Sequence, residues 1–295
     1  MNLEDQKGTE HRRRAVYSRA VRALRQAGVP NPELDASVIM GFVTEEPPEK
    51  VLLDRDRPLA PQQALHYRDL IVRRCGREPV SQIVGYREFY SLTIGVAPGV
   101  LTPRPETETL VEEAIRCLEG MAGAPAVLDI GTGSGNIAIA LATAVPRCRV
   151  VAVDISRAAV RTADANARRH GVRDRVLLFR GDRTEGLGAG GCFDMIVSNP
   201  PYIGENEFDR LSPEVRKGDP REALVAGIEG YGLFEPIAEQ SFRLLRPAGI
   251  LLLEVGMGQA PRVAEILARA GFSGLRVVDD LAGTGRVVAG SRNDA

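Results

Sequence analysis

Several features that would assign this chain to a special class are missing from its 295 residues. The four cysteines, Cys75, Cys117, Cys148 and Cys192, are widely scattered and form no CxxC pair. The three histidines are not grouped with them, so the sequence has no metal-ligand spacing and we expect no metal site. Cysteines of this kind are typical of reduced thiols in a cytoplasmic protein, and we expect that location.

Neither sign of charge dominates, since 38 Lys and Arg residues balance 39 Asp and Glu residues for a net charge of -1. This balance does not suggest binding to nucleic acid by bulk electrostatics, and we expect no direct nucleic-acid contact. No apolar stretch is long enough to span a membrane. The polar, basic N-terminus lacks the apolar region of a signal peptide, so we expect no membrane association.

What is present predicts a globular protein of two domains, with 44% hydrophobic and 26% charged residues. Apolar residues in the first part recur at helical spacing, interrupted by prolines and glycines. This pattern predicts helices over residues 12–27, 33–43, 49–53 and 61–74. We assign residues 1–85 to a small N-terminal helical bundle and residues 86–105 to a β-hairpin linker.

The remaining part, residues 106–295, alternates continuous apolar runs with helical patterns. Strands are predicted at residues 126–130, 149–155, 175–179, 193–198 and 249–255, with 275–279 and 285–290 closing one edge. Helices are predicted at residues 106–120, 137–143, 157–170, 233–245 and 261–270. Apolar strands separated by helices indicate an α/β fold whose sheet is covered on both faces. The expected fold is doubly wound and Rossmann-like, with seven mostly parallel strands.

A glycine-rich turn, Gly131-Thr132-Gly133-Ser134-Gly135, follows the first predicted sheet strand and precedes a helix. Glycines allow close approach of the backbone to a ligand, and the helix N-terminus supplies free N–H groups. Asp154 ends the next strand, the usual place for an acid that binds ribose hydroxyls. The dinucleotide pattern G-x-G-x-x-G would need glycine at position 136, where Asn136 stands. A tight turn without a ligand is the structural alternative.

A second turn, Asn199-Pro200-Pro201-Tyr202, follows the buried strand 193–198. Neither proline has an N–H, so the chain cannot continue a sheet ladder there. A stiff turn with an amide side chain, exposed carbonyl acceptors and an aromatic ring suits a planar substrate that carries an NH2 group. The alternative is an ordinary proline-rich loop.

The spacing Asp-x-Gly-x-Gly-x-Gly from Asp129 resembles motif I of class I S-adenosylmethionine-dependent methyltransferases. Asp182, after the third strand, resembles the position where that family holds adenine. Cofactor-binding residues implied by this resemblance are Gly131, Thr132, Gly133, Ser134, Gly135, Asp154, Asp182, Arg183 and Asn199. Methyltransferases with this second turn act on weakly nucleophilic nitrogen. We therefore expect Asn199, Pro200, Pro201 and Tyr202 to be the catalytic residues, with the Asn199 and Pro200 carbonyls accepting the substrate N–H bonds.

Nearly the whole chain, from about Ala15 to Val288, resembles the HemK family of protein-(glutamine-N5) methyltransferases. The resemblance rests on residues 79–85, the run Leu101-Thr102-Pro103-Arg104-Pro105-Glu106-Thr107-Glu108, both turns, and residues 219–224 and 252–256. It implies methylation of the glutamine in the Gly-Gly-Gln motif of class I peptide chain release factors, with the N-terminal domain docking the factor. It also implies that Phe89, Arg104 and Glu106 line the active site beside residues 199–202. The alternative for these three residues is a hairpin core and a salt bridge at a helix start.

Three other functions remain open at this point. A nucleic-acid amine methyltransferase acting on DNA adenine or rRNA would share the second turn but needs a basic channel. A ribosomal-protein glutamine methyltransferase would share the chemistry but differ in the Pro-Arg-Pro-Glu-Thr-Glu run. A non-catalytic adaptor would be expected to lose the glycine turn or Asn199. We expect an enzyme that works as a monomer.

Overall fold

The computed structural model describes residues 12–54, 56–184, 186–187 and 190–293. The chain divides into two compact units, the first formed by residues 1–85 and 212–218 and the second by residues 86–211 and 219–295. Among the described residues, no helix is both long and apolar enough to cross a bilayer.

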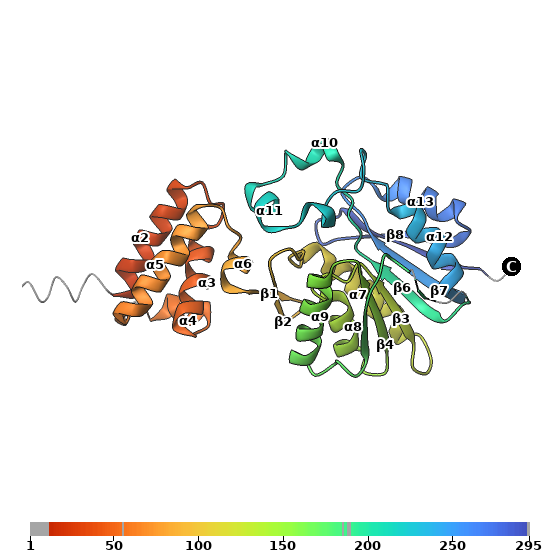
Figure 1. Ribbon diagram of the computed structural model, residues 1–295, viewed down its shortest axis with the longest axis horizontal. Helices are drawn as coiled ribbons and strands as arrows, with labels where there is room; N and C mark the ends of the chain where they lie inside the picture. Colours follow the sequence, from red (N-terminus) through yellow and green to blue (C-terminus); the bar gives the residue numbers. More distant parts are fainter. Residues whose placement is uncertain (1–11, 55, 185, 188–189, 294–295) are drawn as a thin grey trace, which may run out of the picture. The chain divides into compact units, whose positions relative to one another are not determined.

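The first unit is a helical bundle, drawn in red and orange in Figure 1. Its helices are α2 (Arg13–Gln26), α3 (Pro32–Thr44), α4 (Pro48–Leu53), α5 (Pro61–Cys75) and α6 (Val80–Val84). Helices α3, α4 and α5 have proline at their N-terminal ends, where its missing N–H costs no helical hydrogen bond. The buried Tyr67 donates a hydrogen bond to the Ala36 carbonyl at 3.1 Å, joining α5 to α3. The four predicted helices are present, and α6 is additional.

Helix α11 (Pro213–Gly218) belongs to this first unit although it comes from the second half of the sequence. Both carboxylate oxygens of Glu214 accept from Arg77, at 2.7 and 2.8 Å, and Arg74 reaches Oε1 at 3.1 Å. Burial opposes ionisation, but the hydrogen bonds from the two arginines lower the pKa of Glu214 to about 2. The position of α11 is therefore fixed by charge-assisted hydrogen bonds rather than by sequence proximity.

The second unit contains a seven-stranded sheet with the order β5-β4-β3-β6-β7-β9-β8. The strands are β3 (Ala126–Ile130), β4 (Arg149–Asp154), β5 (Val176–Arg180), β6 (Phe193–Ser198), β7 (Leu245–Glu254), β8 (Phe272–Asp279) and β9 (Gly285–Arg292). The first five are parallel, and β9 pairs antiparallel with both β7 and β8. This arrangement confirms the predicted mostly parallel, doubly wound sheet.

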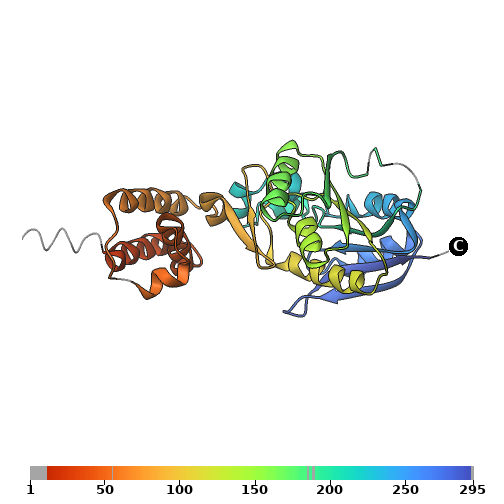
Figure 2. The same cartoon turned by 90° about the horizontal axis from the view of Figure 1, so that it is seen from below.

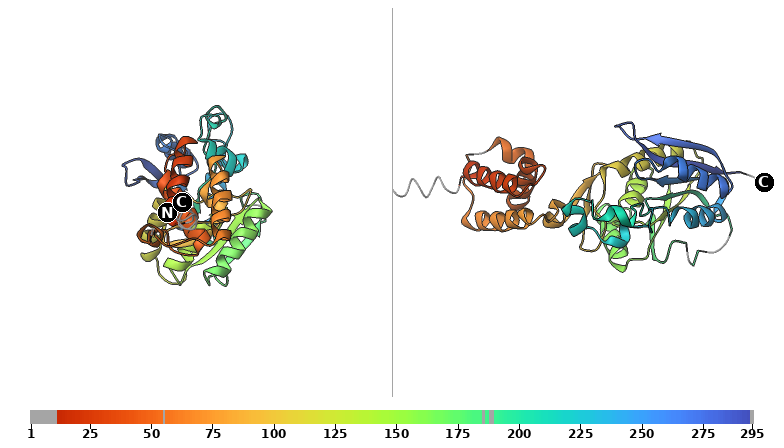
Figure 3. Two further views of the ribbon diagram at one scale, coloured as in Figure 1. Left: turned by 90° about the vertical axis from the view of Figure 1, so that its left-hand side faces the viewer. Right: turned by 90° about the horizontal axis from the view of Figure 1, so that it is seen from above.

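Helices cover both faces of this sheet, as Figures 1 and 2 show. Helices α7 (Glu108–Glu119), α8 (Asn136–Ala144) and α9 (Arg157–Arg169) lie on one face, and α12 (Phe234–Leu244) and α13 (Ala260–Arg269) lie on the other. Each face has its own apolar core, which explains why β3 and β6 are continuous apolar runs. Figure 3 shows the blue C-terminal strands at one edge of the sheet.

Short elements complete the second unit. They are the hairpin strands β1 (Tyr86–Phe89) and β2 (Leu92–Gly95), the 3-10 turns η1 (Pro105–Thr107) and η2 (Arg221–Ala223), and α10 (Glu205–Phe208). Because β3, β4 and β6 are parallel, their carboxyl ends meet at one edge. The segments that follow them are therefore close in space although they are distant in sequence.

Candidate active site

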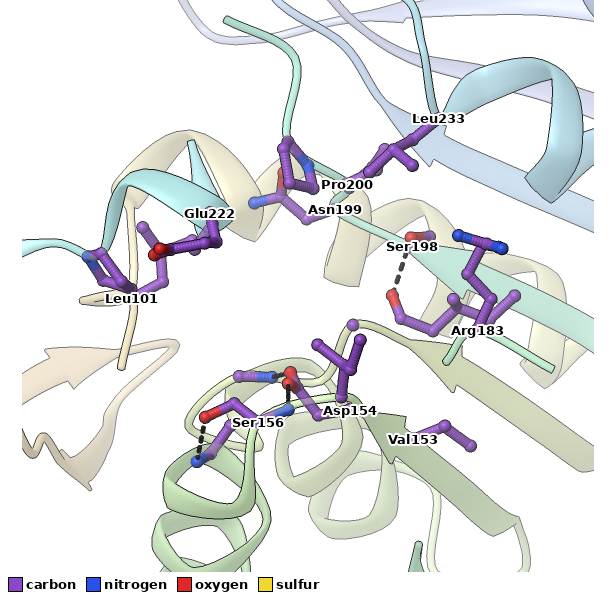
Figure 4. Close-up of a pocket in the computed structure, with 18 of the residues that line it drawn as sticks. Leu101, Val153, Asp154, Ser156, Arg183, Ser198, Asn199, Pro200, Glu222 and Leu233 are labelled. Atoms are coloured by element: carbon purple, nitrogen blue, oxygen red, sulfur yellow. Dashed lines mark hydrogen bonds between the residues drawn. The ribbon is translucent and has the colours of Figure 1, made fainter. Parts of the chain in front are cut away.

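A cavity of about 550 Å³ opens at this edge, within the second unit (Figure 4). Its size is in the range of small-molecule sites. The predicted residues that line it are Gly131, Gly133, Asp154, Asp182, Arg183, Asn199, Pro200 and Pro201. Figure 4 shows Asn199 and Pro200 across the cavity from Asp154 and Ser156. Both turns singled out in the sequence therefore face one space.

The glycine turn needs glycine for two separate reasons. Gly131, Gly133 and Gly135 have φ of +75°, +57° and +82°, a region that other residues rarely adopt. A Cβ on Gly131 or Gly133 would meet no protein atom within 4 Å, so this backbone borders open space. A Cβ on Gly135 would lie 2.9 Å from the Cβ of Ala163 in α9. The first two glycines thus leave room in the cavity, and the third lets α9 pack against the turn.

Asp154 is held at the end of β4 by two backbone donors. Its Oδ2 accepts from the Gly133 N–H and its Oδ1 from the Ser156 N–H, both at 2.8 Å. Burial raises the pKa of this carboxyl, and the two N–H bonds partly offset that rise. Each oxygen keeps a further lone pair, so the carboxylate can accept from a pair of hydroxyls.

Asp129 lies beneath the glycine turn and is completely buried. Its Oδ2 accepts from the Thr132 hydroxyl at 2.6 Å, and its Oδ1 has no hydrogen-bond partner in the described part of the chain. Burial raises the pKa of Asp129 to about 7. Thr132 and Ser134 are also buried, and the Ser134 carbonyl accepts from Asn166 at 2.9 Å. These side chains support the turn from below.

Asp182 and Arg183 follow β5 and form an ion pair with an N–O distance of 3.0 Å. Arg183 has φ of +51°, and its Nε is buried without a hydrogen-bond partner among the described residues. The planar guanidinium can stack on a flat π-system. Asp182 and Arg183 can hold a flat base, and Asp154 can accept from ribose hydroxyls. A base and a ribose are the parts of a nucleoside, so these side chains fit S-adenosylmethionine.

The second turn begins where β6 ends. The Asn199 Nδ2 donates to the Thr107 Oγ at 3.1 Å, which links the turn to η1. The Tyr202 hydroxyl lies 3.4 Å from Oε1 of Glu254 at the end of β7, and Gln259 donates to the Tyr202 carbonyl at 2.9 Å. Burial, followed by the charge of Glu254, raises the pKa of Tyr202. The turn is therefore fixed at both ends by side chains from other elements.

Phe89, Arg104 and Glu106 occupy three different environments. Phe89 is only 1% exposed and packs in the core on the α7 and α8 face of the sheet. Arg104 forms an ion pair with Asp219, and Asp219 also accepts from the Thr102 N–H at 2.9 Å. Glu106 lies exposed in η1. The cavity wall next to the hairpin is formed by residues 99–101 instead.

The prediction of site residues from the sequence did not include Thr107, Asp219, Glu222 or Glu254. Glu222 lines the cavity, and Thr107 accepts from Asn199, which lines it as well. Asp219 and Glu254 bind residues next to the cavity lining, namely Thr102 and Tyr202. Glu254 carried a usable signal, since it is a carboxyl inside the apolar run 250–255 and charged groups are rarely buried without a reason. Thr107 gave no such signal in the sequence. Within the described ranges, no group of His, Cys, Asp and Glu side chains could hold a metal ion.

Comparison with known proteins gives matches to both units. The PrmC N-terminal domain matches residues 15–85, and the methyltransferase small domain matches residues 110–212. A solved methyltransferase from Pyrococcus furiosus covers 70% of this chain and 91% of its own, with a TM-score of 0.52 and 20% identity. That likeness supports the methyltransferase fold.

Curated relatives match along almost the whole chain. The release factor glutamine methyltransferase of Rhodospirillum rubrum is 41% identical over 95% of this chain and 85% of its own. That of Geobacter sulfurreducens is 41% identical over 90% of this chain and 92% of its own. The enzymes of this family use S-adenosylmethionine as methyl donor, which agrees with the side chains of Asp154, Asp182 and Arg183 described above. The chain belongs to the family of release factor glutamine methyltransferases.

Proposed function

We propose that this protein transfers a methyl group from S-adenosylmethionine to the side-chain amide nitrogen of the glutamine in the Gly-Gly-Gln motif of class I peptide chain release factors. The observation that carries the proposal is the position of Asn199 and the two prolines on a cavity whose other side fits the methyl donor. The similarity to release factor glutamine methyltransferases over 95% of the chain supports the substrate class.

Asn199 and Pro200 hold the amide group of the substrate. An amide nitrogen is a weak nucleophile because its lone pair is delocalised into the carbonyl. Two acceptors, the Asn199 side-chain oxygen and the Pro200 carbonyl, bind its two N–H bonds and orient the lone pair. When bound, S-adenosylmethionine would supply an electrophilic methyl group on a sulfonium. The C–N bond would form in line as the C–S bond breaks, S-adenosylhomocysteine would leave with its sulfur as a thioether, and the nitrogen would lose one proton to solvent. Positioning and electrostatics provide the catalysis, so no strong base is needed before attack.

The remaining predicted residues shape the entrance for a glutamine-bearing loop. Pro201 stiffens the turn, and the Tyr202 ring flanks the planar amide. Arg104, fixed by its ion pair with Asp219, and the exposed Glu106 bind the loop beside the glutamine. Phe89, at the end of β1, packs in the core on the α7 and α8 face of the sheet and so keeps the hairpin in place. Thr132, Ser134 and Gly135 set the shape of the cofactor turn.

The helical unit docks the body of the release factor, a role supported by the match of residues 15–85 to the PrmC N-terminal domain.

The protein works as a monomer in the cytoplasm and makes no direct contact with nucleic acid. The net charge of -1 supports the last point. Light scattering of the purified protein tests the oligomeric state, and a mobility shift with ribosomal RNA tests the nucleic-acid contact.

Mass spectrometry of the substrate tests the proposal directly. An intact class I release factor is incubated with the protein and S-adenosylmethionine and then digested. We expect a gain of about 14 Da, the mass of one added CH2, on the peptide with the Gly-Gly-Gln glutamine. A release factor with that glutamine replaced by glutamate serves as the control and gains nothing. Methylation of a ribosomal protein or of DNA, with an unmodified release factor, would refute the proposal.

A further inference from the structure

A further cavity of about 480 Å³ lies beside the active-site cavity, within the second unit. One wall is the segment 95–98, which follows β2. The other wall is formed by side chains of α9 between positions 158 and 169. Figure 1 shows α9 beside the hairpin to which β2 belongs. This cavity is called the α9 groove below.

A tight turn separates the α9 groove from the active-site cavity. The Val100 N–H donates to the Ala97 carbonyl at 3.1 Å, and Gly99 has φ of +75°. These are features of a type II turn, which favours proline at its second position and glycine at its third. Pro98 lines the α9 groove, and Gly99 lines the active-site cavity. Since successive Cα atoms are about 3.8 Å apart, a peptide that passes over this turn goes from one cavity to the other within a few residues.

Asn166 holds the α9 groove in shape. This buried residue accepts from the Gly95 N–H through its Oδ1, and its Nδ2 donates to the Gly95 carbonyl, both at 2.9 Å. The same Nδ2 donates to the Ser134 carbonyl in the glycine turn, also at 2.9 Å. One amide therefore binds the groove wall to α9 and to the turn that borders the active-site cavity, so the groove is preformed.

Two arginines of the α9 groove have no counter-ion. Arg161 and Arg169 are exposed, and neither forms an ion pair or a hydrogen bond within the described part of the chain. The one acidic residue of α9, Asp164, is already bound by Arg168 at 2.8 Å and by Arg173. The groove is thus a positive site on a protein whose net charge is -1.

The spacing of these two arginines fits an extended ligand. Residues eight apart lie on the same side of a helix, with their Cα atoms about 12 Å apart along the axis. Ala165 lies between them, one turn from each, and its small side chain leaves the space between them open. A small anion would reach only one of them. Two carboxylates about four residues apart on an extended peptide, which rises about 3.3 Å per residue, would reach both.

We propose that the α9 groove binds an acidic segment of the release factor that flanks the methylated glutamine, an inference that rests on the proposed function. The groove begins where the active-site cavity ends, at Pro98 and Gly99, so the chain next to the glutamine reaches it directly. Carboxylates of this segment pair with Arg161 and Arg169 and set the direction in which the loop enters. The groove adds affinity away from the reacting atoms and leaves the chemistry to the turn after β6.

Replacement of both arginines by glutamine tests the proposal in steady-state kinetics with an intact release factor. Arg161→Gln/Arg169→Gln should raise KM for the factor at least about threefold, because exposed ion pairs each contribute modestly. Its kcat, and its affinity for S-adenosylhomocysteine in calorimetry, should stay as in the wild type. KM should rise steeply with salt in the wild type, since salt screens exposed charges, and much less in the variant.

Arg243→Gln/Arg269→Gln is the matched control. It removes the same charge from α12 and α13, which lie on the other face of the sheet. Both arginines are exposed, and neither has an ion pair among the residues that the structure describes. Arg269 ends α13 as Arg169 ends α9, so the loss of a cation at a helix end is matched as well. This variant should keep the KM and the salt dependence of the wild type.

Ala165→Glu tests the α9 groove without removing an arginine. A glutamate at this position is one helical turn from both Arg161 and Arg169 and pairs with them, so KM should rise about as much as in the double variant. Ala165→Gln adds a side chain of the same size without the charge and should leave KM near the wild-type value. Wild-type KM in both Arg161→Gln/Arg169→Gln and Ala165→Glu would overturn the proposal.

Direct binding separates the α9 groove from the proposed function. Fluorescence anisotropy with a labelled hexaglutamate peptide measures the groove without methyl transfer. The wild type and the matched control should bind this peptide more tightly than Arg161→Gln/Arg169→Gln does. If the wild type fails to methylate a release factor, the proposed function is wrong, and this titration still decides whether the groove binds acidic peptides. Equal affinities in all three proteins would refute the proposal, as would a loss of ribosomal RNA binding in the double variant with an unchanged KM for the release factor.

Discussion

The two turns that end the neighbouring strands β3 and β6 are built in opposite ways. The turn after β3 has three glycines at positive φ, and Gly131 and Gly133 line the cavity. The turn after β6 has two prolines, which have no N–H, and brings oxygen acceptors to the same cavity. The comparison shows how one sheet edge separates two tasks. In the proposed function, the glycine turn leaves room for the nucleoside of the methyl donor, and the stiff proline turn holds the NH2 group of the substrate.

The two turns share one device despite this contrast. Each is supported from inside by a buried carboxyl, Asp129 under the first and Glu254 beside the second, and burial raises the pKa of both to about 7. In each case a hydroxyl of the turn is directed to the carboxyl: Thr132 donates to Asp129, and the Tyr202 hydroxyl lies 3.4 Å from Oε1 of Glu254. The glycine turn after β3 and the stiff proline turn after β6 therefore both have an internal support. The following variants test how far the parallel holds.

Replacement of Asn199 by alanine should have the largest effect. Removing one oriented polar group at a reacting centre costs roughly 100- to 1,000-fold in kcat, and we expect a loss of this size with unchanged affinity for S-adenosylhomocysteine. Radiolabelled methyl transfer to a release factor measures the rate. Asn31→Ala, at an exposed position before α3, is the control and should behave as the wild type. A variant of Asn199 that keeps kcat would remove the substrate turn from the mechanism.

The pH dependence of stability should change in Asp129→Asn. The pKa of Asp129 is raised in the folded state, so the folded protein binds its proton more tightly than the unfolded chain does. Its contribution to stability is full below a pH of about 4 and is lost as the pH rises to about 7. The asparagine variant lacks this loss, and its stability relative to the wild type should increase by roughly 2 to 3 kcal/mol between pH 5 and 8.

Urea unfolding of both proteins at pH 5, 6, 7 and 8 measures this difference. The control is Asp209→Asn, an exposed carboxyl in the loop after α10, for which the difference from the wild type should be constant. A constant difference for Asp129→Asn as well would mean that Asp129 is ionised throughout this range.

Replacement of Gly131 by alanine should weaken cofactor binding by about tenfold. Alanine at φ of +75° is strained by about 1 to 2 kcal/mol, and its Cβ would point into space that borders the cavity. Gly171→Ala is a matched control, because its φ is +66°, its Cβ also meets nothing within 4 Å, and it lies after α9, outside the cavity lining. Both variants should lose similar stability. Only Gly131→Ala should bind S-adenosylhomocysteine more weakly in calorimetry, and equal affinities would contradict a cofactor role for this turn.

Pro201→Ala should have the smallest effect. Alanine makes the unfolded chain more flexible, which lowers stability by about 0.4 to 1 kcal/mol, and the acceptors of the turn are retained. We expect kcat to fall only about twofold in the methyl-transfer assay, because positioning loosens while the chemistry is intact. A loss as large as that of Asn199→Ala would show that stiffness of the backbone, and not the amide, dominates at this turn.

Much of the sheet could be predicted because its strands are buried on both faces. Strands β3 and β6 begin and end at the predicted residues 126–130 and 193–198. Strand β7 begins at Leu245, four residues before the predicted start. A bulge separates this start from the apolar run: Ala248 has φ of +60°, and the pairing with β6 shifts register there. Helix α6 was missed because its five residues are too few to show helical periodicity.

The candidate site could be predicted only where one segment of sequence contains a whole motif. The glycine turn and residues 199–202 are such segments. Thr107 and Glu254 are separated by about half the chain. They contact Asn199 and Tyr202, respectively, only after β6, β7 and η1 are assembled. Phe89 illustrates the reverse problem, since an aromatic residue near a motif can equally be part of the core.

Because α11 belongs to the helical unit, it limits how the protein can be divided into fragments and how its units can be exchanged. The methyltransferase unit does not correspond to one continuous stretch of the gene, because residues 212–218 belong to the other unit. A fragment that starts at Tyr86 would carry α11 without Arg74 and Arg77, the two cations that bind Glu214. Exchange of the helical unit with that of a related chain would therefore have to include residues 212–218 together with the first 85 residues.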